Sequence, residues 1–141
     1  DAVSKKEIRH VGLSESVSLV ARGLGWELDK VQEEIEPLIA KNRVMTDHFI
    51  VDPTFVSGVQ QFGRGIVKGE EKVTLELVMA VDAGEAYDEA WIEGNPNLHS
   101  VVKGIHGDIS TAAVVANTAR RVVEAKPGLL TMVDLPLVSA R

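Results

Sequence analysis

Apolar residues follow a helical period over the first predicted element of the chain. From Leu13 to Leu24 they recur every three to four positions, which predicts an amphipathic helix of about three turns. Ser14 is the expected N-cap of this helix. Gly25 is expected to end it, because glycine readily takes the left-handed conformation found after many helices.

A second helix is predicted immediately after the first. Asp29 and Gln32 have the spacing of a capping box, and Pro37 is expected to weaken the end of the helix. The predicted buried stripe consists of Leu28, Val31, Ile35 and Leu38.

After residue 42 the apolar positions change to a period of two, which is typical of strands. The first predicted strand rests on the alternation of Met45, Phe49 and Val51. Turn signals separate it from the strands that follow. The predicted strands cover 45–51, 56–67, 72–81, 87–93 and 98–103.

Glycines interrupt the second of these strands at Gly58, Gly63 and Gly65. Glycine in a strand predicts a bulge, or a place where another backbone or a ligand comes close. A glycine-containing turn at 68–70 then predicts a hairpin into the third strand.

The longest helical pattern covers residues 108–124. Asp108 is the expected N-cap, and Pro127 and Gly128 are expected to end the element. Two helices, four or five mostly hairpin-connected strands and a final long helix predict an α+β fold. We expect one domain over 1–141, with an antiparallel-rich mixed sheet of four to five strands covered on one face by helices, the long C-terminal one among them.

Composition narrows the classes of partner. The chain has 141 residues and a formal net charge of -6, and a surface that binds nucleic acid needs clustered Lys and Arg. It lacks the long apolar run of a membrane span. The 141 residues include no cysteine, which excludes disulfides and thiolate catalysis and is consistent with a reducing cytoplasm. We therefore expect neither a nucleic-acid nor a membrane partner.

Histidine and asparagine supply the candidate chemistry. The four histidines are not spaced to place two on one helix face, so no metal site is predicted. His106 lies at the start of the long helix, where a neutral imidazole could polarise a carbonyl or orient an amine. The alternative is a structural hydrogen bond to Asp108. Asn117 lies mid-helix and either faces solvent, bonds a neighbouring loop or points into a pocket.

The chain also resembles a known family over nearly its whole length, with its motifs in the same order. The closing segment resembles the C-terminal domain of 2,4-diaminopentanoate dehydrogenases, and related amine dehydrogenases and dihydrodipicolinate-reductase-like proteins have a similar ending. The resemblance is carried by the segments 10–13, 15–16, 25–28, 104–108 and 111–113, by Asn117, and by 121–122, 127–129, 131–132 and 134–136.

The resemblance implies that this chain is the second domain of a longer dehydrogenase. An N-terminal Rossmann domain, missing here, would bind NAD or NADP, and this domain would close the substrate cleft and form a homodimer or higher homo-oligomer. The implied reaction is reversible oxidative deamination of a small amine or amino acid in the cytoplasm. The isolated chain is then expected to be inactive.

The same resemblance places a set of residues along the substrate cleft, with His106 the best candidate. The principal acid/base group is expected in the missing half, so no residue here is assigned a catalytic role. The expected substrate-binding residues are His106, Gly107, Asp108, Thr111 and Asn117.

Two other functions remain open at this point. One is a freestanding α+β binding or assembly module without catalysis, which a Rossmann domain encoded upstream of Asp1 would exclude. The other is a domain of a dihydrodipicolinate-reductase-like enzyme. It is less favoured, because the chain lacks a basic, histidine-rich substrate loop.

Overall fold

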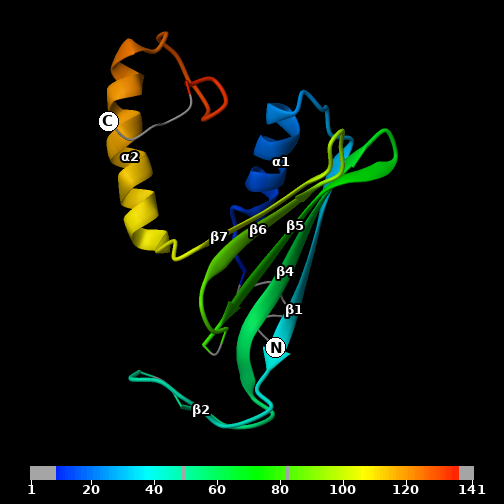
Figure 1. Cartoon of the computed structure of the whole chain (residues 1–141), viewed down its shortest axis with the longest axis vertical. Helices are drawn as coiled ribbons and strands as arrows, with labels where there is room; N and C mark the ends of the chain where they lie inside the picture. Colours follow the sequence, from blue (N-terminus) through cyan, green and yellow to red (C-terminus); the bar gives the residue numbers. More distant parts are fainter. Residues whose placement is uncertain (1–8, 49, 82, 137–141) are drawn as a thin grey trace. The chain divides into compact units, whose positions relative to one another are not determined.

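The computed structural model describes residues 9–48, 50–81 and 83–136, and it confirms the α+β class (Figure 1). The chain divides into two compact units, residues 1–83 (unit 1) and 84–141 (unit 2). Every strand pair in the described ranges is antiparallel. In chain order the elements are α1 (Leu13–Gly23), β1 (Lys30–Ile39), β2 (Val44–Met45), β3 (Ile50–Val51), β4 (Val56–Val67), β5 (Glu70–Ala80), β6 (Tyr87–Ile92), β7 (Leu98–Lys103) and α2 (Gly107–Glu124).

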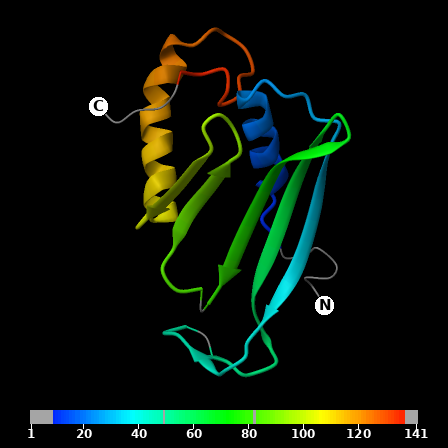
Figure 2. The same cartoon turned by 45° about the vertical axis from the view of Figure 1, so that its right-hand side comes forward.

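Unit 1 is built on a three-stranded sheet with the order β1-β4-β5 (Figure 2). The hairpin between β4 and β5 turns at Lys68 and Gly69, whose φ angles are 52° and 79°. Two central residues with positive φ between paired Val67 and Glu70 are typical of a type I′ turn, which matches the twist of the flanking strands. The turn predicted at 68–70 is therefore confirmed.

The second predicted helix is wrong, because 30–39 form the edge strand β1. Val31 and Ile35 are four residues apart, and this spacing satisfies a helix and a strand equally. Proline has no backbone N–H to donate to a neighbouring strand. Pro37 is tolerated because an edge strand has no neighbour on its outer side. Asp29 does not cap a helix; its Oδ2 accepts a hydrogen bond of 2.9 Å from the backbone N–H of Gly69 in the β4–β5 turn.

The strand predicted at 45–51 is also replaced by a different structure. Val44 pairs with Val51 and Met45 pairs with Ile50, so two short strands form a separate hairpin, β2–β3. Phe49, on which the prediction partly rested, lies outside the described residues.

Helix α1 packs on one face of the main sheet, and the glycines of β4 permit the close approach. A Cβ added at Gly63 would lie 2.9 Å from Cγ2 of Val17, and one at Gly65 would lie 2.9 Å from Cγ1 of the same side chain. A bulge follows Gly65. The predicted bulge is thus present, and what approaches Gly63 and Gly65 is the Val17 side chain of the helix instead of another backbone or a ligand.

The core of unit 1 lies at this helix–sheet junction. Val17 and Ala21 of α1 are fully buried and contact Val73 of β5. The apolar residues packed around them are Leu28, Val31 and Leu75. The core is small, so each close contact in it carries a large share of the packing.

Helix α1 ends as its glycine predicts. The N–H of Trp26 donates to the carbonyl of Ala21 at 2.8 Å, and the N–H of Gly25, at φ 73°, donates to the carbonyl of Arg22 at 3.0 Å. This pair of bonds is a Schellman motif. At the other end the N-cap is Gly12; Ser14, the expected cap, already lies within the helix.

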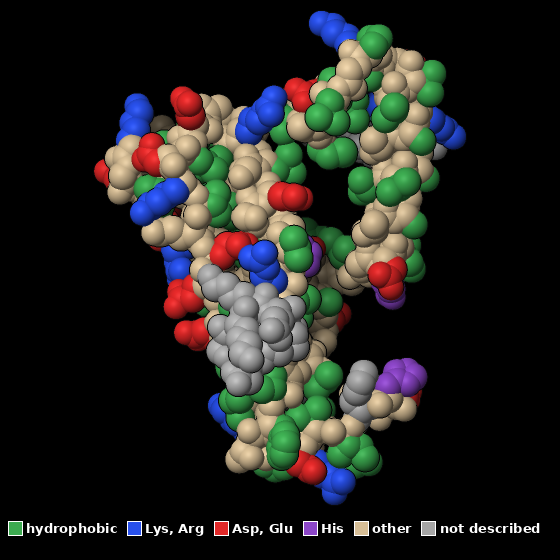
Figure 3. Space-filling model, turned by 180° about the vertical axis from the view of Figure 1, so that it is seen from behind, with side chains coloured by type: hydrophobic (Ala, Val, Ile, Leu, Met, Phe, Trp, Pro, Cys, Tyr) green, Lys and Arg blue, Asp and Glu red, His purple; other side chains and the backbone are tan. Residues whose placement is uncertain are grey.

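Unit 2 consists of the hairpin β6–β7 followed by α2. No residue that the structure describes between 84 and 136 is buried. Hydrophobic side chains lie exposed along α2, as Figure 3 shows. Unit 2 therefore has an amphipathic helix and a hairpin but no core of its own. Neither of the helices in the described ranges has the length and apolarity to cross a membrane.

Candidate functional site

The candidate site begins where β7 gives way to α2. Gly104 has φ 77°, a conformation that favours glycine, and it turns the chain out of the strand. His106 is the N-cap of α2, with extended torsions of φ -92° and ψ 116°. Its carbonyl accepts the hydrogen bond of 2.9 Å from the N–H of Ser110. The imidazole is therefore presented at the exposed mouth of the helix.

Asp108 is not the N-cap, although its residue type predicted it. It lies in the first turn of α2, two residues after His106, where a carboxylate stabilises the positive end of the helix dipole. The helix begins one residue earlier than expected because Gly107 already has helical pairing.

The structural alternative for His106 is not observed. Within 9–48, 50–81 and 83–136 no hydrogen bond joins the His106 ring to Asp108, and both residues are exposed. Ring and carboxylate are therefore both available to a ligand.

The predicted site residues do not all lie together. His106 is the cap of α2, Gly107 and Asp108 lie in its first turn, and Thr111 lies at the start of the second turn. Asn117 lies nine residues beyond Asp108, about 13 Å along the axis and on the opposite side of an ideal helix. Asn117 is half-buried. The structure thus brings four of the five residues to the helix N-terminus and leaves Asn117 apart.

A second polar cluster lies on the β6–β7 hairpin, and the sequence pattern alone did not reveal it. The rings of Trp91 and His99 are stacked, with centroids 3.5 Å apart and an interplanar angle of 9°. His99 Nε2 lies 2.7 Å from Oε1 of Glu89. Trp91 and His99 are directly paired across the strands, so the cluster depends on the hairpin register.

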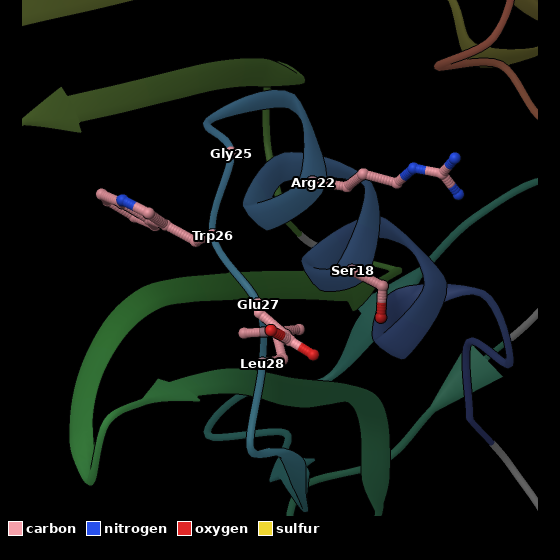
Figure 4. A pocket seen from close by; sticks show the side chains of 6 residues that line it. All are labelled: Ser18, Arg22, Gly25, Trp26, Glu27 and Leu28. Atoms are coloured by element: carbon pink, nitrogen blue, oxygen red, sulfur yellow. The ribbon is translucent and has the colours of Figure 1, made fainter.

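Unit 1 contains a hollow of about 430 Å³ beside the C-terminal end of α1 (Figure 4). Trp26, which follows the glycine at the end of α1, lines it. In Figure 4 the side chains of Trp26 and Arg22 point away from each other. The complete lining is Ser18, Arg22, Gly25, Trp26, Glu27 and Leu28. The hollow is open to solvent.

Outside these clusters, one carboxyl group has a shifted pKa, and the cause is a neighbouring lysine side chain. Lys72 lowers the pKa of the Glu70 carboxyl, first through a side-chain hydrogen bond and then through its charge. Glu70 is fully exposed and begins β5. Across the described part of the chain, no group of three or more His, Asp or Glu residues could hold a metal ion.

Comparison with known proteins identifies the family to which the chain belongs. The profile of the 2,4-diaminopentanoate dehydrogenase C-terminal domain matches residues 2–141. The chain belongs to this family. The resemblance noted in the sequence is thereby confirmed.

Two curated relatives and one solved structure are similar to the chain. It is 29% identical over 137 residues to 2,4-diaminopentanoate dehydrogenase from Acetoanaerobium sticklandii, which covers 93% of this chain and 39% of the relative. It is 27% identical over 142 residues to an amine dehydrogenase from Streptomyces virginiae, covering 86% and 39%. The chain therefore spans about two fifths of the length of these relatives.

The fold matches an amine dehydrogenase from Mycobacterium smegmatis with a TM-score of 0.74. The match covers 88% of this chain and 38% of that protein, at 22% sequence identity. At this identity the likeness establishes the fold alone.

Proposed function

We propose that this chain is the substrate-binding and oligomerisation part of an NAD(P)-dependent dehydrogenase that deaminates a primary amine or diamino acid. The observation that carries the proposal is the family match from residue 2 to residue 141. Both curated relatives are named as dehydrogenases, one of a diamino acid and one of an amine. The nicotinamide would be held mainly by a domain outside this chain.

In the proposed reaction the carbon that bears the amine gives a hydride to the nicotinamide. The nitrogen loses a proton to leave an imine, and water converts the imine to a carbonyl and ammonia. The nicotinamide, when bound, supplies the hydride acceptor. The share of this chain is to bind and orient the amine.

The N-terminus of α2 supports that role. His106 carries a ring nitrogen, Asp108 a carboxylate and Thr111 a hydroxyl, all exposed between the cap and the start of the second turn. An ammonium group donates hydrogen bonds to such acceptors. Gly107 lets a substrate approach the backbone, because it has no side chain. Asn117 stays a separate prediction, since its position on α2 is more than two turns away.

The lack of a core in unit 2 supports the oligomerisation role. Exposed apolar residues on α2 include Ile109, Val115, Val122 and Val123. A surface of this kind is typical of contact with another protein surface. A homodimer or larger homo-oligomer would cover it.

The test compares this chain with a longer protein in which an upstream dinucleotide-binding domain precedes Asp1. The longer protein should form reduced nicotinamide when given an amine, and the chain alone should not. Calorimetry should detect NAD or NADP binding to the longer protein only. Turnover of an amine by residues 1–141 alone, or tight cofactor binding by them, would contradict the proposal.

A further inference from the structure

We propose that one face of the β6–β7 hairpin binds the ammonium group of an organic amine. The face is formed by Tyr87, Glu89 and Trp91 of β6, which lie at alternate positions and therefore project to the same side. A carboxylate is thus flanked by two aromatic rings. The inference rests on the proposed function, because that function supplies an amine as the substrate, and it adds an ammonium-binding surface outside the α2 N-terminus.

Both aromatic side chains are exposed to solvent. Trp91 is 71% exposed and Tyr87 is 59% exposed. His99 stacks on Trp91 and so fixes the orientation of the indole. Cations bind over the faces of tryptophan and tyrosine, with tryptophan the better of the two. An oriented and accessible indole is the main component of a site for an alkylammonium ion.

The carboxylate between the rings is held in place through one of its two oxygens. Oε1 of Glu89 lies 2.7 Å from His99 Nε2, and the Glu89 side chain is 32% exposed. Its other oxygen, Oε2, has no hydrogen-bond partner among the residues described. One carboxylate oxygen therefore fixes the group, and the second can accept from an ammonium N–H.

Charges on the hairpin favour a cation from solution. Residues 87–103 contain three carboxylates and one lysine, Lys103. Lys103 pairs with Tyr87 across the strands, on the same face as Glu89. No ion pair within the described ranges joins Lys103 to Glu89, whose recorded partner is the imidazole of His99. The protein's own lysine therefore leaves the carboxylate available.

The first experiment asks whether the site prefers charge. The chain has two tryptophans, so in the variant Trp26→Phe the fluorescence reports Trp91 alone. Titration with n-butylammonium chloride should change this fluorescence saturably, with a dissociation constant on the order of 1 mM. Titration with 1-butanol, at matched sodium chloride, should not. An equal response to the alcohol would overturn the proposal, and so would the lack of a saturable response to the amine.

The second experiment separates binding from hairpin structure. Glu89→Gln keeps the size of the side chain and its contact to His99, and it should weaken n-butylammonium binding at least about tenfold. Tyr87→Leu should weaken it less. Glu93→Gln, on the same hairpin, is the matched control and should bind as the parent does. If Glu89→Gln binds as tightly as the parent, the cluster is only a cross-strand pair that stabilises the hairpin.

The folding of each variant is checked by the cross-peaks of β6 and β7 in a heteronuclear NMR spectrum. If Glu89→Gln loses them, the comparison of n-butylammonium with 1-butanol in the Trp26→Phe chain still decides. Ammonium binding without dehydrogenase activity in the longer protein would refute the proposed function alone. Activity without ammonium binding at Trp91 would refute the hairpin site alone.

Discussion

His106 is the residue whose contribution to function can be tested most directly. In the longer protein, His106→Ala should lower kcat/KM for the amine about tenfold or more, because the ring lies at the open end of α2 and contacts the substrate in the proposed complex. The dissociation constant of NAD or NADP should stay unchanged. Steady-state kinetics and calorimetry measure the two quantities. His48→Ala, on an exposed histidine of unit 1, is the control, and unchanged kinetics in His106→Ala would remove this residue from the site.

Gly63 is one of the two residues of β4 at which the sheet comes closest to Val17 of the helix. In Gly63→Ala the new Cβ would lie 2.9 Å from Val17 Cγ2 and 3.2 Å from Leu13 Cγ. Such overpacking should lower the free energy of unfolding by about 1–3 kcal/mol, measured by urea denaturation. Gly23→Ala is the matched control, because nothing lies within 4 Å of its added Cβ. Equal stability of the two variants would contradict the packing described for α1.

Gln61 is a buried amide that hydrogen-bonds to the backbone of His10, which precedes α1, and to the side chain of Glu33 in β1. Its Oε1 accepts from the N–H of His10 at 2.8 Å, and its Nε2 donates to the carbonyl of His10 at 3.1 Å and to Glu33 Oε1 at 3.3 Å. Gln61 is 1% exposed, so Gln61→Leu leaves the two backbone groups of His10 without these partners.

The expected loss for Gln61→Leu is about 1–3 kcal/mol in the free energy of unfolding. Gln60→Leu is its neighbour on the opposite face of β4, where the side chain bonds Glu76 in an exposed position. It should change stability by less than about 0.5 kcal/mol. A larger effect at residue 60 than at residue 61 would show that the polar core contact is unimportant.

At the scale of elements, the end of α1 depends on a single backbone conformation. Gly25→Ala forces a side chain into φ 73° and should cost about 1–2 kcal/mol, although its added Cβ meets no atom within 4 Å. Gly25→Asn should lose less, because asparagine tolerates this region better. Thermal unfolding followed by circular dichroism ranks the three proteins. Equal midpoints for Gly25→Ala and the parent would rule out the strain.

The elements that the sequence predicted correctly are those whose period was unambiguous. α1, β4, β5 and the long helix α2 follow their patterns closely. β1 was missed because Glu33 occupies an inward position between Val31 and Ile35 and interrupts the alternation. Glu33 is tolerated there through Arg9, 3.3 Å away, and through the amide of Gln61. These partners are far apart in sequence, so no local pattern contains them.

The residues of the candidate site also differ in whether they could be predicted from the sequence. His106, Gly107, Asp108 and Thr111 were predicted together through the family resemblance, and they are near neighbours in sequence at one helix end. The Trp91–His99 stack was missed, although both strands were predicted, because it depends on the turn that fixes their register. That turn includes a hydrogen bond of 2.9 Å from the N–H of Gly94 to Oδ1 of Asn97.

At the scale of the whole molecule, the two units differ in the source of their stability. Unit 1 has a core formed by α1 and three strands, whereas the described residues of unit 2 are all at least partly exposed. A two-stranded hairpin and a single helix are each only marginally stable in water. Unit 2 is therefore expected to open locally far more often than unit 1 when the chain is alone.

Hydrogen exchange measures this difference directly. In the isolated chain, amides of β6, β7 and α2 should exchange at least about tenfold faster than those of β4, the central strand of the main sheet. In the longer protein, which is proposed to be an oligomer, their protection should rise toward that of β4, because a second surface would cover the apolar side chains of α2. Protection in β4 itself should change little and serves as the internal control. Equal protection of both units in the isolated chain would mean that unit 2 is stable without a partner, which would remove the physical reason for assigning it an interface.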